Sequence, residues 1–124
     1  MSDACYCDYD ERPDVYHAKI MGARTKHKCY ECGGGIVPGQ RYERAAMLYE
    51  GSWEVAKTCG LCLEARDYIK AHAPCFCWLH GSMLDDAKSV IDEYGHESAG
   101  FYIGAMKRVL RAERHQPPTR EHGA

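Results

Sequence analysis

Two runs of residues, 41–49 and 53–58, mix aromatic and aliphatic side chains with charged ones, as partly buried strands do. A short break that contains Gly51 stands between them, and such a break between two strand-like runs is typical of a tight turn. The pattern therefore predicts a β-hairpin. Residues 13–26 have no clear period, and both a strand and irregular chain are compatible with them.

Apolar residues recur at spacings of three and four along three later stretches, which predicts three amphipathic helices. The first begins at Cys59 and ends before Pro74, the second covers residues 83–94, and the third runs from an N-capping Ser98 to residue 114. The apolar faces expected for these helices are, in order, Leu61, Ala65, Tyr68 and Ile69; Leu84, Ala87, Ile91 and Tyr94; and Tyr102, Met106, Val109 and Leu110. A hairpin followed by helices indicates the α+β class.

These elements divide the chain into three parts. We expect residues 1–80 to form one small domain, residues 81–114 to form a helical extension packed on it, and residues 115–124 to be a disordered tail. Trp78, next to a cysteine, is expected in the core. Trp53 on the hairpin fits the core and the surface equally well.

Composition places the chain among ordinary soluble proteins. Its 124 residues are 45% hydrophobic and 27% charged, and no apolar run approaches the roughly 20 residues that a membrane-spanning helix needs. The first residues lack the basic start and apolar stretch of a secretory signal. We therefore expect no membrane association and a cytoplasmic location, where disulfides are rare.

The candidate chemistry lies in eight cysteines, which occur as four close pairs: Cys29/Cys32, Cys59/Cys62, Cys5/Cys7 and Cys75/Cys77. Paired spacing is typical of metal ligands, and eight thiols can complete two tetrahedral four-cysteine sites. A reducing compartment disfavours disulfides, and we prefer zinc to an iron–sulfur cluster. We therefore expect two structural zinc ions, each of which stabilises the fold directly.

The first predicted helix separates two of the pairs. The helical residues after Cys62 carry the chain about 15 Å away. Only Ala73 and Pro74 then precede Cys75, and two residues are too few to return to the same ion. The pair Cys59/Cys62 and the pair Cys75/Cys77 therefore belong to different sites.

Residues 29–35, Cys-Tyr-Glu-Cys-Gly-Gly-Gly, have the pattern of a zinc knuckle. A knuckle, a hairpin and a Cys-x-x-Cys pair at a helix N-terminus make a treble-clef arrangement, which joins the two Cys-x-x-Cys pairs on one zinc. Elimination leaves the two Cys-x-Cys pairs for the second zinc. The expected ligand sets are Cys29, Cys32, Cys59 and Cys62, and Cys5, Cys7, Cys75 and Cys77.

Two alternatives to these sets stay open. In a cross-braced arrangement, Cys5/Cys7 share an ion with Cys59/Cys62. In the other alternative a histidine replaces a cysteine, and His27, His72 and His80 are the nearest candidates. A solvated surface histidine is the expected role of each, because the cysteines already fill both sites.

The segments Cys5-Tyr-Cys-Asp-Tyr-Asp, Lys26-His-Lys-Cys-Tyr-Glu-Cys-Gly, Lys57-Thr-Cys-Gly-Leu-Cys and Cys75-Phe-Cys-Trp resemble those of a group of small phage and prophage proteins. The likeness covers roughly residues 4–80. The block Cys-x-x-Cys-Gly…Ile-x-x-Gly-x-x-Tyr is also similar to LIM-like and other treble-clef modules. The resemblance implies a phage origin and metal binding, and it implies no particular activity.

Nothing in the chain predicts a catalytic centre. A catalytic zinc keeps an open coordination position, whereas four cysteines leave no room for a reactive water. The sequence also lacks the His-Glu-x-x-His pair, the phosphate-binding glycine loop, the nucleophile elbow and the zinc-deaminase signature. We expect a protein that is not an enzyme, with a metal-dependent hydrolase as a distant alternative.

Charge bears on the expected partner. The formal net charge is −2, and eight thiolates with two zinc ions lower it to about −6, which works against general nucleic-acid binding. We therefore expect docking on a host protein, as an inhibitor or adaptor, through aromatic and arginine side chains. Nucleic-acid binding through the basic knuckle and the basic last helix is the alternative. The candidate binding residues are Trp53, Tyr49, Arg41, Arg44, Lys107, Arg108 and Arg111.

Overall fold

The computed structural model describes residues 13–73 and 75–115. Its elements are, in chain order, β1 (Val15–Gly22), β2 (His27–Lys28), β3 (Gly35–Ile36), β4 (Arg41–Tyr49), β5 (Ser52–Cys59), α1 (Gly60–His72), α2 (Met83–Tyr94), the 3₁₀ helix η1 (Gly95–Glu97) and α3 (Ala99–Arg114). Over these described residues the fold is therefore mixed: it has a three-stranded antiparallel sheet of β1, β4 and β5, a two-stranded antiparallel sheet of β2 and β3, and three α-helices. The predicted hairpin and helices are confirmed, and residues 15–22, which the pattern left open, form a strand.

The larger sheet has β4 at its centre, with β1 and β5 antiparallel on either side. Glu50 and Gly51 connect β4 to β5, and both have positive φ angles, 49° and 85°, as a two-residue hairpin turn requires. Side chains alternate between the two faces of a strand. We call the face toward α1, which carries Glu43, the inner face, and the opposite face, which carries Trp53, the outer face.

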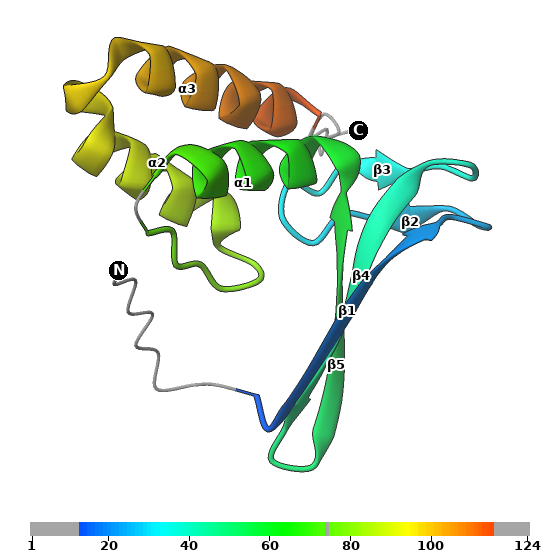
Figure 1. Cartoon of the computed structure of the whole chain (residues 1–124). Helices are drawn as coiled ribbons and strands as arrows, with labels where there is room; N and C mark the ends of the chain where they lie inside the picture. The colour runs from blue at the N-terminus through cyan, green and yellow to red at the C-terminus, as the bar shows by residue number, and fades with distance from the viewer. Residues whose placement is uncertain (1–12, 74, 116–124) are drawn as a thin grey trace, which may run out of the picture.

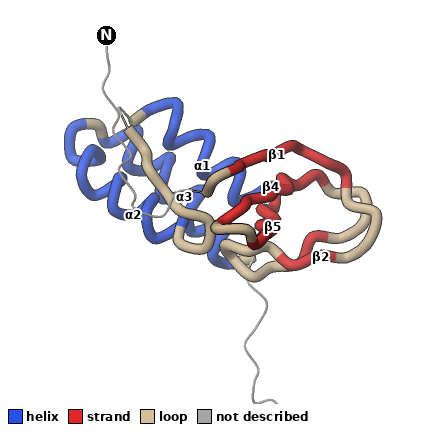
Figure 2. Tube along the Cα trace, turned by 90° about the horizontal axis from the view of Figure 1, so that it is seen from below, coloured by secondary structure: helices blue, strands red, loops and turns tan. Residues whose placement is uncertain are grey.

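The strands and the helices occupy different sides of the molecule. Figure 1 shows α1 continuing directly from β5, with α3 running along α1 and the hairpin extending away from the helices. Figure 2, from below, shows the same separation of strands from helices. In the part of the chain that the structure describes, no helix combines the length and the apolar character needed to cross a bilayer.

One buried cluster joins the cysteine-containing loops to all three helices. It includes Cys29, Cys62, Ile69, Ile91 and Val109, each at most 2% exposed. The four cysteines of the two Cys-x-x-Cys pairs therefore lie in the same interior as the apolar faces of the helices. Any metal bound between these thiols stabilises the interior that the helices share.

The buried face of α3 differs from the predicted one. The predicted face was Tyr102, Met106, Val109 and Leu110, whereas the buried residues are Phe101, Ala105, Val109 and Ala112. Tyr102 and Leu110 are exposed. Val109 belongs to both sets and Met106 packs partly buried against the same cluster, so the prediction is wrong for Tyr102 and Leu110 only. Small side chains such as Ala105 and Ala112 let α3 approach α1 closely, which apolar size alone does not indicate.

Gly104 lies where α3 meets α1. A Cβ atom there would stand 2.3 Å from the hydroxyl oxygen of Tyr68, whose ring is held between His72, at 4.1 Å between centroids, and Arg108, at 4.0 Å. We expect Gly104→Ala to destabilise the protein by about 1–3 kcal/mol through overpacking, measured by urea unfolding. The matched control is Gly100→Ala on the same helix, where nothing lies closer than 4.0 Å. An equal effect of the two substitutions would contradict this packing.

Candidate metal centre

The two Cys-x-x-Cys pairs meet at one point of the fold. Cys29 and Cys32 lie in the turn between β2 and β3, Cys59 ends β5, and Cys62 lies in the first turn of α1. All four are buried, and their sulfur atoms lie within 4.8 Å of one another. The first predicted ligand set is therefore positioned to bind a metal ion.

The sulfur geometry matches a tetrahedral ion. The Sγ atoms of Cys29 and Cys62 are 3.8 Å apart, and those of Cys32 and Cys59 are 3.7 Å apart. Zinc–thiolate bonds are about 2.3 Å long, so two ligands of a regular tetrahedron stand about 3.8 Å from each other. The two measured edges therefore fit the size of a zinc–sulfur tetrahedron.

Backbone amides surround the sulfurs. The amides of Glu31 and Cys59 donate to Cys29 Sγ at 3.4 and 3.3 Å, and the amide of Gly34 donates to Cys32 Sγ at 3.3 Å. Gly33 between them has a φ of 76°, which lets the loop turn tightly. Cys62 in the first turn of α1 lies near the positive end of the helix dipole. These groups stabilise negative charge on the sulfurs.

Contacts among the four thiols change their pKa values in opposite directions. Hydrogen bonds with Cys32, Cys59 and Cys62 hold the pKa of Cys29 well below its ordinary value. The hydrogen bond to Cys29 in turn raises the pKa of Cys62. Four neighbouring thiolates need a cation between them, so metal binding here releases protons and weakens in acid.

The knuckle is also tied to the helices. The carboxylate of Glu31, between the two cysteines, accepts hydrogen bonds from the amides of Gly81 at 2.8 Å and Met83 at 3.0 Å, at the start of α2. On the other side, His115 Nε2 lies 3.1 Å from the carbonyl oxygen of Gly35. The cysteine loop therefore fixes the positions of two helix ends.

The second predicted ligand set is described only in part. Cys5 and Cys7 lie outside the described residues. Cys75 and Cys77 hold their sulfurs 3.6 Å apart, on one side of the chain as expected, which is too far for a disulfide between the two. Each of them takes part in a disulfide in the structure. A second zinc, and with it the cross-braced alternative, stays a prediction that depends on the redox state of these thiols.

The histidines considered as substitute ligands lie outside the four-cysteine group, which is the only cluster of metal-ligand type among the described residues. His27 Nδ1 lies 3.2 Å from the ammonium nitrogen of Lys57. His80 Nε2 lies 2.8 Å from the hydroxyl oxygen of Tyr16. His72 Nδ1 lies 2.8 Å from a carbonyl oxygen one turn earlier in α1.

The predicted binding residues of the hairpin are divided between the two faces of the sheet. Trp53 is 60% exposed on the outer face, which places it on the surface, and Arg44 belongs to the same face. Tyr49 and Arg41 belong to the inner-face set, at opposite ends of β4. The four residues therefore do not form one surface.

The predicted basic residues of α3 are partly engaged within the fold. Arg111 Nη1 lies 3.4 Å and Arg108 Nε 3.8 Å from the carboxylate of Glu64 on α1. The guanidinium of Arg108 also covers the Tyr68 ring. Lys107 is exposed. Two of the three cations are thus drawn toward α1.

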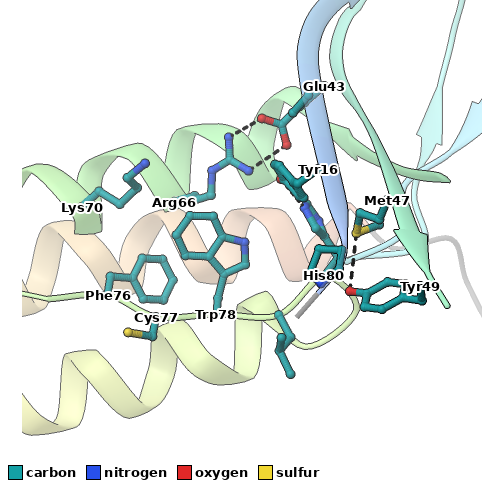
Figure 3. Close-up of a pocket in the computed structure, with 13 residues that line it drawn as sticks. Tyr16, Glu43, Met47, Tyr49, Arg66, Lys70, Phe76, Cys77, Trp78 and His80 are labelled. Carbon is teal, nitrogen blue, oxygen red and sulfur yellow. Dashed lines mark hydrogen bonds and ion pairs between the residues drawn. The ribbon is translucent and has the colours of Figure 1, made fainter. Parts of the chain in front are cut away.

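Sequence reasoning missed a buried ion pair between the sheet and α1. The two terminal nitrogens of Arg66 donate to the two carboxylate oxygens of Glu43 at 2.9 and 2.8 Å (Figure 3), with both residues less than 10% exposed. The hydrogen bonds from Arg66 lower the pKa of Glu43. The available signal was the place of Arg66 on the buried stripe of α1, between Ala65 and Ile69.

Comparisons with known proteins add no relative. No family model, no curated protein and no solved structure matches the chain. The resemblance to phage proteins stays a prediction, and the arguments for function come from the residues themselves.

Proposed function

We propose that the chain is a zinc-stabilised binding protein, whose metal centre holds the fold while the outer face of its sheet docks on a partner protein. The observation that carries this proposal is an exposed apolar patch on the outer face, at the hairpin end of the sheet. A host protein of the bacterium that a phage infects is the partner we favour, in keeping with the resemblance.

Zinc is the metal that we assign to the cysteine centre, because four thiolates in a tetrahedron are its typical structural ligand set. Four sulfurs complete its coordination, so we propose a structural ion and no enzymatic activity. The order of knuckle, hairpin and helix supports a treble-clef relationship. A second zinc at Cys75 and Cys77 belongs to the proposal too, and it needs both thiols reduced, as in a cytoplasm.

The patch extends across all three strands of the larger sheet. Its two rows, read from β1 through β4 to β5, are Val15, Leu48 and Trp53, and His17, Ala46 and Val55. Val15 and Val55 are 43% and 41% exposed, in addition to Trp53. Tryptophan is enriched among the few residues that contribute most of the binding free energy of protein interfaces, and here smaller apolar side chains lie beside it.

A row of basic residues borders the patch and indicates which kind of partner surface can bind there. Lys19, Arg44 and Lys57 stand opposite one another in the next outer-face row toward the cysteines. A partner surface that presents an apolar side chain beside carboxylates complements both rows. We therefore propose an acidic partner surface with one apolar anchor.

The same row favours a second candidate function. Cations beside an exposed tryptophan can hold a single-stranded nucleic acid, with a base stacked on the indole. The contacts of Arg108 and Arg111 with Glu64 weaken the case for α3 as a phosphate-binding helix. The net charge of −2 also opposes phosphate binding, so we rank this function second.

Trp53→Ala is expected to weaken partner binding by about tenfold or more, because buried interface tryptophans contribute about 2 kcal/mol or more. The thermal midpoint should stay nearly unchanged, because Trp53 is already exposed. The measurement is a titration of the purified partner, after its capture from a bacterial lysate. The matched control is Ile103→Ala, an apolar residue on α3 that is 64% exposed.

Three results would contradict the proposal. A large loss of stability in Trp53→Ala would assign this residue to the interior. Equal binding by both variants would move the interface elsewhere. Tight, salt-sensitive binding of single-stranded or duplex DNA that is lost in Arg44→Glu would place nucleic acid first.

A further inference from the structure

A cavity of about 500 Å³ lies on the inner side of the sheet, opposite the outer face that carries Trp53. It is open to solvent on one side and lined by the inner face of β1 and β4, by α1, and by the segment 76–80 (Figure 3). Its volume is in the range of small-molecule sites in proteins. Four aromatic side chains contribute to its walls: Tyr16, Tyr49, Phe76 and Trp78.

One end of the cavity is cationic. Arg66 and Lys70, one turn apart on α1, place their charges 5.2 and 5.3 Å from the centre of the Trp78 ring. The carboxylate of Glu43 neutralises Arg66 through two hydrogen bonds. Lys70 forms no ion pair within residues 13–73 and 75–115. Asp67 also lies 3.9 Å from Arg66 Nε, but its side chain is 71% exposed and does not line the cavity. Lys70 is therefore the cavity-lining cation whose charge no carboxylate of the described residues pairs with, in a chain whose net charge is negative.

The other end offers an oriented hydroxyl group. Tyr16 stacks on His80, and its hydroxyl oxygen lies 2.8 Å from His80 Nε2. The carboxylate of Glu31 lies 3.6 Å from Nδ1 of the same ring, too far for a hydrogen bond but near enough for its negative charge to favour a proton on Nδ1. Nε2 then accepts a hydrogen bond from the hydroxyl group of Tyr16. The phenolic oxygen keeps its lone pairs for a donor group in the cavity.

We propose that this cavity binds a small planar aromatic anion, such as a nucleoside monophosphate or an aromatic acid. The ring packs against the aromatic walls, and the anionic group pairs with Lys70. A polar N–H group on the ring can donate to the hydroxyl oxygen of Tyr16. Aromatic walls select a flat ligand, and a cation without an acidic partner selects a negative charge on it.

The test uses the full chain carrying Trp53→Phe, so that Trp78 is its only tryptophan. Adenosine 5′-monophosphate is expected to change the Trp78 fluorescence and to bind measurably in calorimetry. Adenosine, which lacks the charge, and inorganic phosphate, which lacks the ring, should each bind about tenfold more weakly or worse. A parallel titration with 4-aminobenzoate distinguishes the two classes of ligand. If it binds as tightly as adenosine 5′-monophosphate, the site accepts aromatic acids in general. If it binds more weakly, the site is assigned to nucleotides.

Lys70→Gln locates the anion. This exposed substitution should weaken adenosine monophosphate about tenfold and leave adenosine unchanged, whereas Lys107→Gln on α3 should change neither. The proposal is overturned if neither anionic probe binds, if inorganic phosphate binds as tightly as the nucleotide, or if Lys70→Gln binds like the parent chain. Trp53 is already replaced in every arm, so none of these outcomes depends on docking at the outer face.

Discussion

Removal of the metal from the centre formed by Cys29, Cys32, Cys59 and Cys62 is expected to unfold the protein. A structural zinc contributes about 10–16 kcal/mol of apparent folding free energy in small peptides, whereas the net stability of a whole domain is about 5–15 kcal/mol. The four thiols also lie inside the buried cluster that joins the helices, so loss of the metal should destabilise all three described α-helices. Far-UV circular dichroism during titration with a strong chelator measures the effect.

Two controls belong to the chelation experiment. The same chelator loaded beforehand with zinc should leave the spectrum unchanged, and added zinc should restore the native spectrum of the stripped protein. A chain that elemental analysis shows to be free of metal, yet which keeps its helical signal and its cooperative melting, would show that the apolar interior is sufficient without the ion.

Glu43→Ala is expected to cost about 3–5 kcal/mol, the second largest effect that the structure predicts. The substitution leaves the guanidinium of Arg66 buried between sheet and helix without its carboxylate. A charge left in such a place has lost most of its water, and the exposed carboxylate of Asp67, 3.9 Å from Arg66 Nε, replaces little of the lost pairing. Urea unfolding of the zinc-loaded protein measures the loss.

An exposed ion pair provides the matched control. Glu113 on α3 pairs with Lys88 on α2, and their side chains are 31% and 41% exposed, against about 10% for Glu43 and Arg66. Glu113→Ala should therefore cost less than about 1 kcal/mol. The double variant Glu43→Leu with Arg66→Met should recover much of the stability lost in Glu43→Ala, because it removes both charges together. Equal losses in Glu43→Ala and Glu113→Ala would contradict the burial of the inner pair.

The element order could be predicted because each element has a local signal. The helix α2 coincides with the predicted residues 83–94, where charged and apolar positions alternate with helical spacing. The side chain of Ser98 accepts a hydrogen bond from the amide of Phe101, as its N-cap position suggested. Spacing, capping groups and turn residues act within a few positions of the chain, so they can be recognised without the tertiary structure.

The buried side of α3 could not be predicted in the same way. Ala105 and Ala112 are buried, whereas the larger Tyr102 and Leu110 are exposed. Which side of an amphipathic helix is covered depends on how closely a neighbouring helix approaches. Here Gly104 allows Tyr68 of α1 to come near, and the contact follows from the tertiary structure.

The same distinction between local and tertiary information applies to the candidate sites. The Cys-x-x-Cys pairs carry their chemistry and their spacing in the sequence, and they meet as expected. The cavity depends on residues from β1, β4, α1 and the segment after it, such as Tyr16, Arg66 and Trp78. No spacing rule joins positions that lie so far apart in the chain. Arg66 on a buried stripe was the one local sign that this region contains more than apolar packing.

Zinc K-edge X-ray absorption of the purified protein tests the central claim most directly. A metal held by Cys29, Cys32, Cys59 and Cys62 predicts a shell of four sulfur neighbours at about 2.3 Å, with no nitrogen or oxygen ligand. Cys32→Ser should remove one sulfur from that shell or abolish binding. A shell that contains nitrogen or oxygen in the parent protein, or a protein purified without metal and fully folded, would contradict the account.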